Sequence, residues 1–188
     1  SWGWALDGYY EQDVLDAIDY FVGTKTDVEG DDINKAQRNL AGGVMFFATG
    51  NDGVTGNFYP ACYPSVVAVG SMTNDYTIAP YSNYGEWVDI VAPGGLVTYG
   101  SAGGVLSTLP GDSYGFNEGT SMATPHVTGV AALLVSQYGN SDMSAETIRQ
   151  QILTSVNDIY EYNSGVVGMH GAGYIDAAKA LQMNPDGE

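Results

Sequence analysis

A serine stands where a loop gives way to a helix, in the segment Gly119-Thr120-Ser121-Met122-Ala123-Thr124-Pro125-His126. The first N–H groups of a helix have no partner within the helix, and the helix start carries partial positive charge. An oxyanion formed when Ser121 attacks a carbonyl would be stabilised there, so the segment is compatible with acyl transfer. The alternative is that Thr120 or Ser121 merely caps the helix.

A second candidate group follows the apolar run Phe47-Ala48, in the turn Thr49-Gly50-Asn51. Ligands bind at the carboxyl ends of strands in α/β sheets, and an Asn amide placed there can donate a hydrogen bond to an oxyanion. The alternative for Asn51 is a plain turn residue.

The elements that must position these groups alternate between helices and strands. Apolar residues at three- and four-residue steps predict an amphipathic helix from about Tyr9 to Val22. Three short runs, Val44 to Ala48, Val66 to Val69 and Val88 to Val91, are apolar at nearly every position. That pattern is typical of parallel strands covered on both faces, so we expect an α/β fold.

The second half of the chain is predicted to be mainly helical. A long helix should run from Thr120 to about Tyr138, with small residues that let it lie close to a sheet. Ser144 is a plausible N-cap for a helix from Ala145 to about Val156. Ile175 to Leu181 resembles a final surface helix. The polar stretch from Gly23 to Asn39 is expected to be a loop, with a short helical piece near residues 33–40.

Composition excludes several classes of protein. The chain has 188 residues, enough for one unit with a substantial core. Its formal charge of −17 argues against a nucleic-acid partner. The lone Cys62 permits no internal disulfide and no thiolate metal cluster. The longest apolar stretches fall short of the roughly 20 residues that a membrane-spanning helix needs.

Four segments in the same order resemble the subtilisin-like serine proteases. Gly119 to Val130 (GTSMATPHVTGV) resembles that family's nucleophile signature, and Ala48 to Asn51 its oxyanion signature; Tyr59 to Gly70 and Tyr81 to Gly94 resemble further family segments. The resemblance implies a subtilisin-like three-layer α/β fold with a mainly parallel central sheet, incomplete in this chain. Residues 1–188 would be the C-terminal portion of a single catalytic domain.

The resemblance also implies roles for individual residues. Ser121 would be the nucleophile, and its N–H together with the Asn51 side chain would hold the oxyanion. The implied substrate-binding residues are Ser1, Trp2 and Gly3, which would pair with the substrate backbone, and Ala48, Thr49 and Gly50, which would form one wall of the pocket for the side chain before the cleaved bond. Phe58 falls where the floor of that pocket is expected, although ordinary packing explains Phe58 equally well.

The family's Asp-Ser/Thr-Gly and His-Gly-Thr-His motifs, which supply the orienting carboxylate and the base, are not found in this sequence. His126 lies five residues after Ser121, a rotation of about 140° on a helix, so it cannot serve as the base. By the resemblance His126 is a buried structural residue. His170 precedes the final helix, in a region that the family places away from the cleft.

Two hypotheses follow. In one, the chain is the nucleophile-bearing portion of a serine endopeptidase that acts on peptides or proteins, with an N-terminal companion segment that carries the triad Asp and His. In the other, it is a catalytically incomplete fragment or pseudo-protease that only binds extended peptides. No cofactor is needed for the chemistry. A structural Ca²⁺ could bind the acidic run at residues 27–32, which is otherwise a solvated loop. The family resemblance makes an extracellular or cell-envelope location the expectation.

Overall fold

The computed structural model describes residues 3–4, 6–23, 42–139 and 144–182. Its centre is a five-stranded sheet in the order β1-β2-β3-β7-β6. The strands are β1 (Phe46–Ala48), β2 (Val67–Met72), β3 (Ile90–Pro93), β6 (Val156–Asn157) and β7 (Tyr174–Ile175). The first four in that order are mutually parallel, and β6 pairs with β7 in the antiparallel sense. The expected mainly parallel α/β sheet is therefore confirmed.

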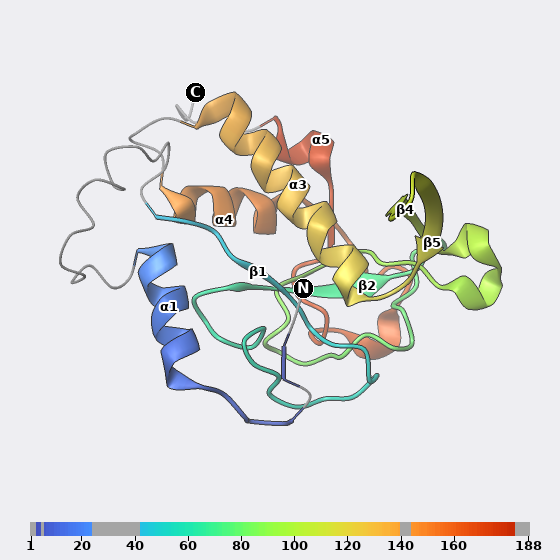
Figure 1. The fold of residues 1–188 in the computed structure, drawn as a ribbon, viewed down its shortest axis with the longest axis horizontal. Coiled ribbons are helices and arrows are strands. Elements are labelled where there is room, and N and C mark those ends of the chain that lie inside the picture. The colour runs from blue at the N-terminus through green and yellow to red at the C-terminus, as the bar shows by residue number, and fades with distance from the viewer. Residues whose placement is uncertain (1–2, 5, 24–41, 140–143, 183–188) are drawn as a thin grey trace.

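Helices cover both faces of the sheet, which gives three layers (Figure 1). Helix α1 (Gln12–Val22) packs on one face, where Leu15 and Ile18 meet Phe47 and Ala68. Helices α3 (Thr120–Tyr138), α4 (Ala145–Thr154) and α5 (Ala177–Ala180) lie on the other face. Because successive strand residues point to opposite faces, one apolar run such as β2, buried at all six positions, serves both layers.

The central helix α3 is buried on its inner side and exposed on its outer side. Ala123, Val127 and Leu134 are fully buried against the strands, whereas Leu133 is 50% exposed. The outer side also carries His126, which is exposed. The expectation that His126 is buried is wrong, because among the described residues nothing covers this side of α3.

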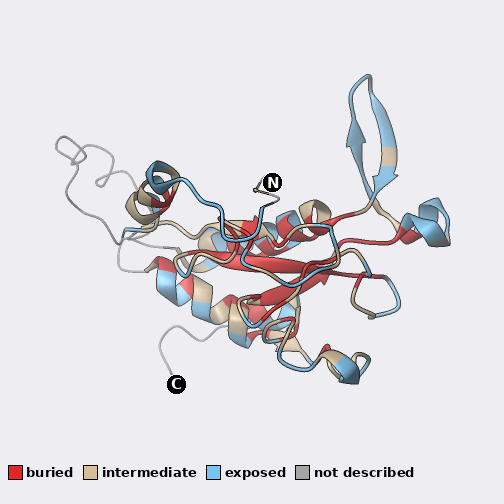
Figure 2. Cartoon of the chain, turned by 90° about the horizontal axis from the view of Figure 1, so that it is seen from below, coloured by how far each residue is buried: buried red, intermediate tan, exposed pale blue. Residues whose placement is uncertain are grey.

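A two-stranded hairpin projects from the molecule just before α3 (Figure 2). Strand β4 (Val105–Leu109) pairs with β5 (Ser113–Asn117), and both are mostly exposed. Short 3₁₀ segments lie at Val97–Tyr99, Ser101–Gly103 and Ser164–Val166. The hairpin was not predicted from the sequence.

For most elements, the predicted and the observed boundaries differ by a few residues. Helix α1 begins at Gln12, and the predicted strand from Val88 lies at Ile90–Pro93. The predicted final helix is wrong at its start, because Ile175 belongs to β7. Its remainder is the four-residue α5, whose Ala180 is fully buried. The predicted helical piece near residues 33–40 lies outside the described residues.

No helix among the described residues is long and apolar enough to cross a membrane.

Candidate active site

A cavity of about 280 Å³ lies where the carboxyl end of β1 meets the start of α3. It brings together most of the residues predicted for the site: Gly3, Ala48, Thr49, Gly50, Asn51, Phe58 and Ser121. Ser1 and Trp2 lie outside the described residues. Residues far apart in the chain therefore meet at one place, as a binding site at the end of parallel strands requires.

The Asn51 side chain is oriented by Thr120, the residue before Ser121. Asn51 Oδ1 accepts hydrogen bonds from the Thr120 N–H (2.8 Å) and from the Thr120 hydroxyl (2.9 Å). The same hydroxyl accepts a hydrogen bond from the Gly50 N–H at 3.3 Å. With its oxygen held by Thr120, the Asn51 amide presents its NH₂ group away from Thr120, where it can donate to a ligand.

The start of α3 depends on Gly119. Its φ of 143° lies in a region that side-chain-bearing residues rarely adopt. The Gly119 N–H is shared between the Gly94 carbonyl and the Tyr81 hydroxyl, each at 3.0 Å. The Gly119 carbonyl accepts from the Met122 N–H at 2.9 Å, which opens the first helical turn. Ser121 is thereby placed within that turn, at the positive end of a long helix.

Aromatic side chains form much of the remaining cavity wall. Phe58 lines the cavity and is 7% exposed, with its ring 6.5 Å from that of Trp87. Trp4 and Tyr59 also line the cavity, and the Trp4 N–H donates to the Tyr59 carbonyl at 3.0 Å. Phe58 thus both packs in the interior and borders the cavity.

Sequence reasoning missed five lining residues: Trp4, Asp52, Tyr59, Asn83 and Thr120. Asp52 and Thr120 adjoin predicted site residues, so proximity in the chain could have suggested them. Asn83 stands 31 positions from Asp52, whose N–H it binds, and no spacing rule links the two.

The described residues place no histidine in the cavity. His126 Nδ1 lies 2.8 Å from the Met122 carbonyl oxygen, on the exposed side of α3. His170 is 2% exposed, packs beside the Tyr84 ring at 5.9 Å, and has no hydrogen-bond partner at Nδ1. Burial lowers the pKa of His170 to about 4, so this imidazole is neutral at pH 7.

Other reactive groups in the described chain do not compete with Ser121. Cys62 is half-buried, and burial raises the pKa of its thiol to about 11, which keeps it protonated and unreactive. Among the described residues, no three His, Cys, Asp or Glu side chains cluster in a way that could hold a metal ion. The acidic run at residues 27–32, the predicted Ca²⁺ candidate, lies outside them.

Asp89 and Arg149 form a partly buried ion pair with 3.3 Å between Oδ1 and an Arg149 guanidinium nitrogen, and the Ala68 N–H donates to Asp89 Oδ2 at 2.8 Å. Burial raises the pKa of Asp89 despite these partners. Because Asp89 joins β2 to α4 and does not line the cavity, we assign it a structural role.

Comparison with known proteins agrees with this geometry. Residues 1–173 match the family model described as the subtilase family. Thermitase of Thermoactinomyces vulgaris is 39% identical over 141 residues, which are 75% of this chain and 45% of that protein. A thermophilic serine proteinase of Bacillus sp. (strain AK1) is 44% identical over 109 residues, 58% of this chain and 25% of that protein.

Solved structures give the same result. A protease from Pseudoalteromonas arctica PAMC 21717 superposes with a TM-score of 0.68 at 28% identity, over 90% of this chain and 57% of that chain. A lanthipeptide protease superposes with a TM-score of 0.66 at 29% identity, over 74% of this chain and 50% of that chain. The chain thus spans about half the length of these solved relatives, and it belongs to the subtilase family of serine peptidases.

Proposed function

We propose that this chain is the nucleophile-bearing portion of a serine endopeptidase. The Ser121 hydroxyl would attack the scissile carbonyl, lose its proton to a base, and form an acyl-enzyme as the amine leaves with a proton. Water would then hydrolyse the ester and restore Ser121. The carbonyl oxygen, negatively charged in each tetrahedral intermediate, would accept hydrogen bonds from the Ser121 N–H and Asn51 Nδ2.

One observation carries this proposal. Asn51 and Ser121 line one cavity, and Thr120 orients the Asn51 amide through two hydrogen bonds. A module that only binds peptides has no need for an amide held in one orientation beside a serine at a helix start.

The substrate would be an extended peptide that pairs with the backbone of residues 1–3. Gly3 lines the cavity, and Ala48, Thr49 and Gly50 form the wall beside it. The side chain before the cleaved bond would enter the cavity and meet Phe58. An extracellular or cell-envelope location, chemistry without a cofactor and a structural Ca²⁺ at residues 27–32 belong to the same proposal and rest on the family resemblance.

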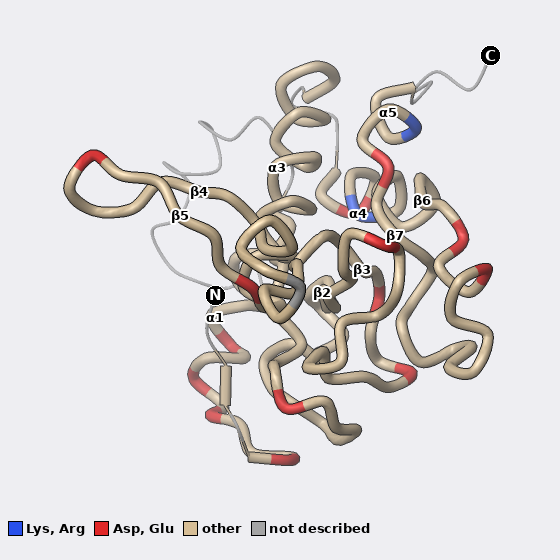
Figure 3. Tube along the Cα trace, turned by 90° about the vertical axis from the view of Figure 1, so that its right-hand side faces the viewer, with Lys and Arg blue, Asp and Glu red and all other residues tan. Residues whose placement is uncertain are grey.

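The base and its orienting carboxylate would come from a polypeptide segment outside residues 1–188. Two surfaces support this. Helix α3, residues 120–138, contains no Asp, Glu, Lys or Arg, as Figure 3 shows. Its outer side is nevertheless exposed among the described residues. The edge of β1 away from β2 pairs with no strand of the described chain. An uncharged helix side and an open apolar strand edge are what a second layer of protein would cover.

The test is intact mass spectrometry after exposure to an aryl fluorophosphonate, which labels activated serines. We expect one adduct per full-length protein, located on Ser121, no adduct in Ser121→Ala, and the wild-type adduct in Ser136→Ala, whose serine lies on the exposed side of α3. Residues 1–188 alone should react far more slowly than the full-length protein, because the base is missing.

Three results would count against the proposal. An adduct that persists in Ser121→Ala would place the nucleophile elsewhere. Labelling of residues 1–188 alone at the full rate would remove the need for a companion segment. A full-length protein that takes no label but still binds an extended peptide would favour the pseudo-protease alternative.

A further inference from the structure

We infer that the segment Tyr81-Ser82-Asn83 is a brace that sets the position of Asn51 relative to the start of α3. The inference rests on the proposed function, because it assigns positioning roles in the oxyanion site of Ser121 and Asn51. The brace has three contacts: Asn83 holds the loop around Asn51, Tyr81 holds Gly119, and Ser82 attaches the segment to the sheet.

Asn83 organises the loop that carries Asn51. Its side chain is fully buried, and Oδ1 accepts hydrogen bonds from the Asp52 N–H (3.0 Å) and the Val54 N–H (3.3 Å). Its own N–H donates to the Gly50 carbonyl at 3.0 Å. Partners on both sides of Asn51 are therefore bound to one residue, so the loop folds around the Asn83 amide.

The fit between Asn83 and this loop leaves no spare room. A Cβ added at Gly50 would lie 2.4 Å from Asn83 Nδ2, far inside a van der Waals contact, and Gly50 has a φ of 104°. A residue without a side chain at position 50 lets the backbone before Asn51 rest directly on the amide. Asn83 thus lines the cavity itself and supports the backbone of Gly50 beside it.

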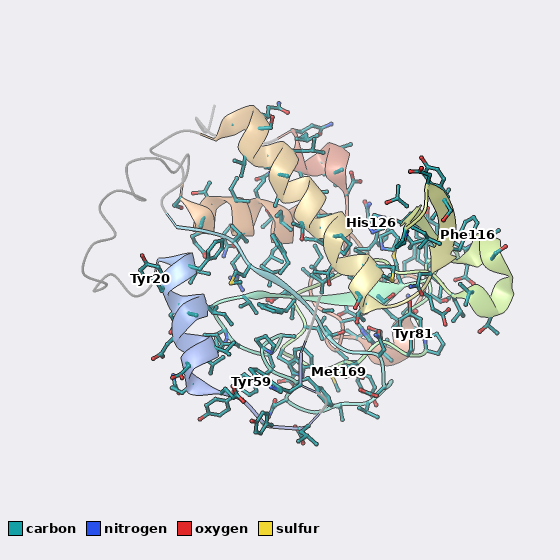
Figure 4. All side chains as sticks on the ribbon, in the orientation of Figure 1. Tyr20, Tyr59, Tyr81, Phe116, His126 and Met169 are labelled. Atoms are coloured by element: carbon teal, nitrogen blue, oxygen red, sulfur yellow. The ribbon has the colours of Figure 1, made fainter. Side chains whose placement is uncertain are left out.

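Tyr81 performs the matching task at the start of α3 and lies beside its first turn (Figure 4). Its hydroxyl donates to the Gly95 carbonyl at 2.6 Å and accepts from the Gly119 N–H at 3.0 Å. The Ser71 hydroxyl lies 2.8 Å away and can donate to the remaining lone pair. Because Gly119 stands two positions before Ser121, the phenol fixes the turn that delivers the Ser121 N–H.

Ser82 connects these two contacts to the rigid part of the molecule. It is 2% exposed, and its hydroxyl accepts from the N–H of Ser71 in the buried strand β2 at 3.0 Å. Its N–H donates to the Ala79 carbonyl at 2.9 Å. The segment is therefore anchored to the sheet between its two contacts with the site.

A brace of this kind matters because oxyanion stabilisation depends on distance. Donors act when they lie about 2.7–3.1 Å from the charged oxygen, and a misplacement of about 1 Å can cost about 100-fold in rate. Thr120 ties Asn51 directly to α3, and the brace adds a second tie through the sheet. We therefore expect Tyr81 and Asn83 to act on the rate of the chemical step through Gly119 and Asn51.

The experiment uses the full-length protein with Tyr81→Phe, which removes one hydroxyl, and Asn83→Ala, which removes the amide. Tyr84→Phe is the matched control, since this tyrosine is three residues further on and packs against His170. We expect each test variant to lower kcat for a peptide amide about 10-fold to 100-fold with KM within about twofold of wild type. The control should keep wild-type kcat.

Amide hydrogen exchange without substrate provides a readout that does not need turnover. Tyr81→Phe should accelerate exchange at the Gly119 N–H, and Asn83→Ala at the Asp52 and Val54 N–H groups, with the amides of β2 unchanged. Unaltered exchange at these three sites, or localised acceleration with unchanged kcat, would overturn the brace. If wild-type protein takes no fluorophosphonate label, the proposed function has failed, and exchange alone then decides whether Tyr81 and Asn83 hold these loops.

Discussion

Helices α3 and α4 lie on the same face of the sheet but are built differently. Helix α4 is capped by Ser144, whose hydroxyl accepts from the Thr147 N–H at 3.0 Å. On its exposed side, Glu146 accepts from Gln150 at 2.6 Å, while Ile148 and Ile152 are fully buried. It is a helix with a capped start, one apolar side and one polar side.

Helix α3 has neither the cap nor a charged side. Gly119 stands at its N-cap without a side-chain hydrogen bond, and the first N–H of the helix, that of Thr120, is bound by Asn51. Its exposed side carries Leu133 in place of charged residues. The first turn of α4 is therefore closed by its own N-cap, whereas the first turn of α3 is bound by a side chain from the distant Asn51 loop.

The strongest test of the two sides of α3 compares adjacent leucines. Leu134 is fully buried and Leu133 is 50% exposed. Leu134→Ala should lower the free energy of unfolding by about 3–4 kcal/mol, because it leaves a cavity against the sheet. In residues 1–188 alone, where Leu133 is exposed, Leu133→Ala should change it by less than about 0.5 kcal/mol. Urea unfolding followed by circular dichroism measures both, and equal losses would mean that the outer side is covered.

The two histidines extend the comparison to acid stability. The pKa of His170 is lowered by burial from 6.5 to about 4, so between these values the unfolded chain binds a proton that the folded chain does not. The contribution of neutral His170 to stability is therefore complete above pH 6.5 and is lost as the pH falls, and the loss amounts to about 3 kcal/mol at pH 4.

Unfolding free energies measured across this pH range should therefore fall less steeply in His170→Gln than in wild type. His126→Gln is the control, because His126 is exposed on α3. A wild-type slope in His170→Gln would show that His170 does not cause the acid sensitivity.

Removal of the α4 cap gives a smaller effect. Ser144→Ala should lower the free energy of unfolding by about 1 kcal/mol, since the Thr147 N–H loses its acceptor. Ser136→Ala, an exposed position inside α3, should have almost no effect. Thermal unfolding of the two variants would measure the difference, and an equal loss would show that the cap contributes little.

The smallest expected effect on the isolated chain comes from a charge on the outer side of α3. Leu133→Glu should leave the unfolding free energy of residues 1–188 within about 0.5 kcal/mol of wild type. In the full-length protein the same change should destabilise markedly, because a carboxylate would be buried beneath the companion segment. Equal stability of the full-length variant and wild type would place the companion elsewhere.

The sequence predicted two kinds of feature well: strands that are buried on both faces of the sheet, and elements that are specified by residues adjacent in the chain. The apolar runs predicted the parallel strands because both of their faces are covered, and the segment from Gly119 predicted α3 with both observed bounds. The family motifs also predicted Ser121, Asn51 and Phe58 as site residues, and the structure places all three at one cavity. The hairpin was not predicted, because its residues are mostly exposed and show no pattern of buried positions. Pro110-Gly111-Asp112 is nevertheless a turn signal between its strands.

Contacts between distant segments could not be predicted. Thr120 binds Asn51 across 69 positions of sequence, and nothing in their spacing indicates it. The exposure of His126 could not be predicted either, because it depends on what packs over the outer side of α3 and not on the helix sequence. The absence of charged residues from α3 favoured burial of the whole helix, but it does not show that the outer side is covered.

The order of the strands has a consequence for biosynthesis. Strand β7, near the end of the described chain, lies between β3 and β6, with Tyr174 beside Val91. A growing chain therefore cannot complete its sheet until β7 has left the ribosome, long after Ser121 has been made. The sheet beneath α3 is therefore complete only after β7 has paired with β3, so the support of the Ser121 helix depends on residues made well after the helix itself.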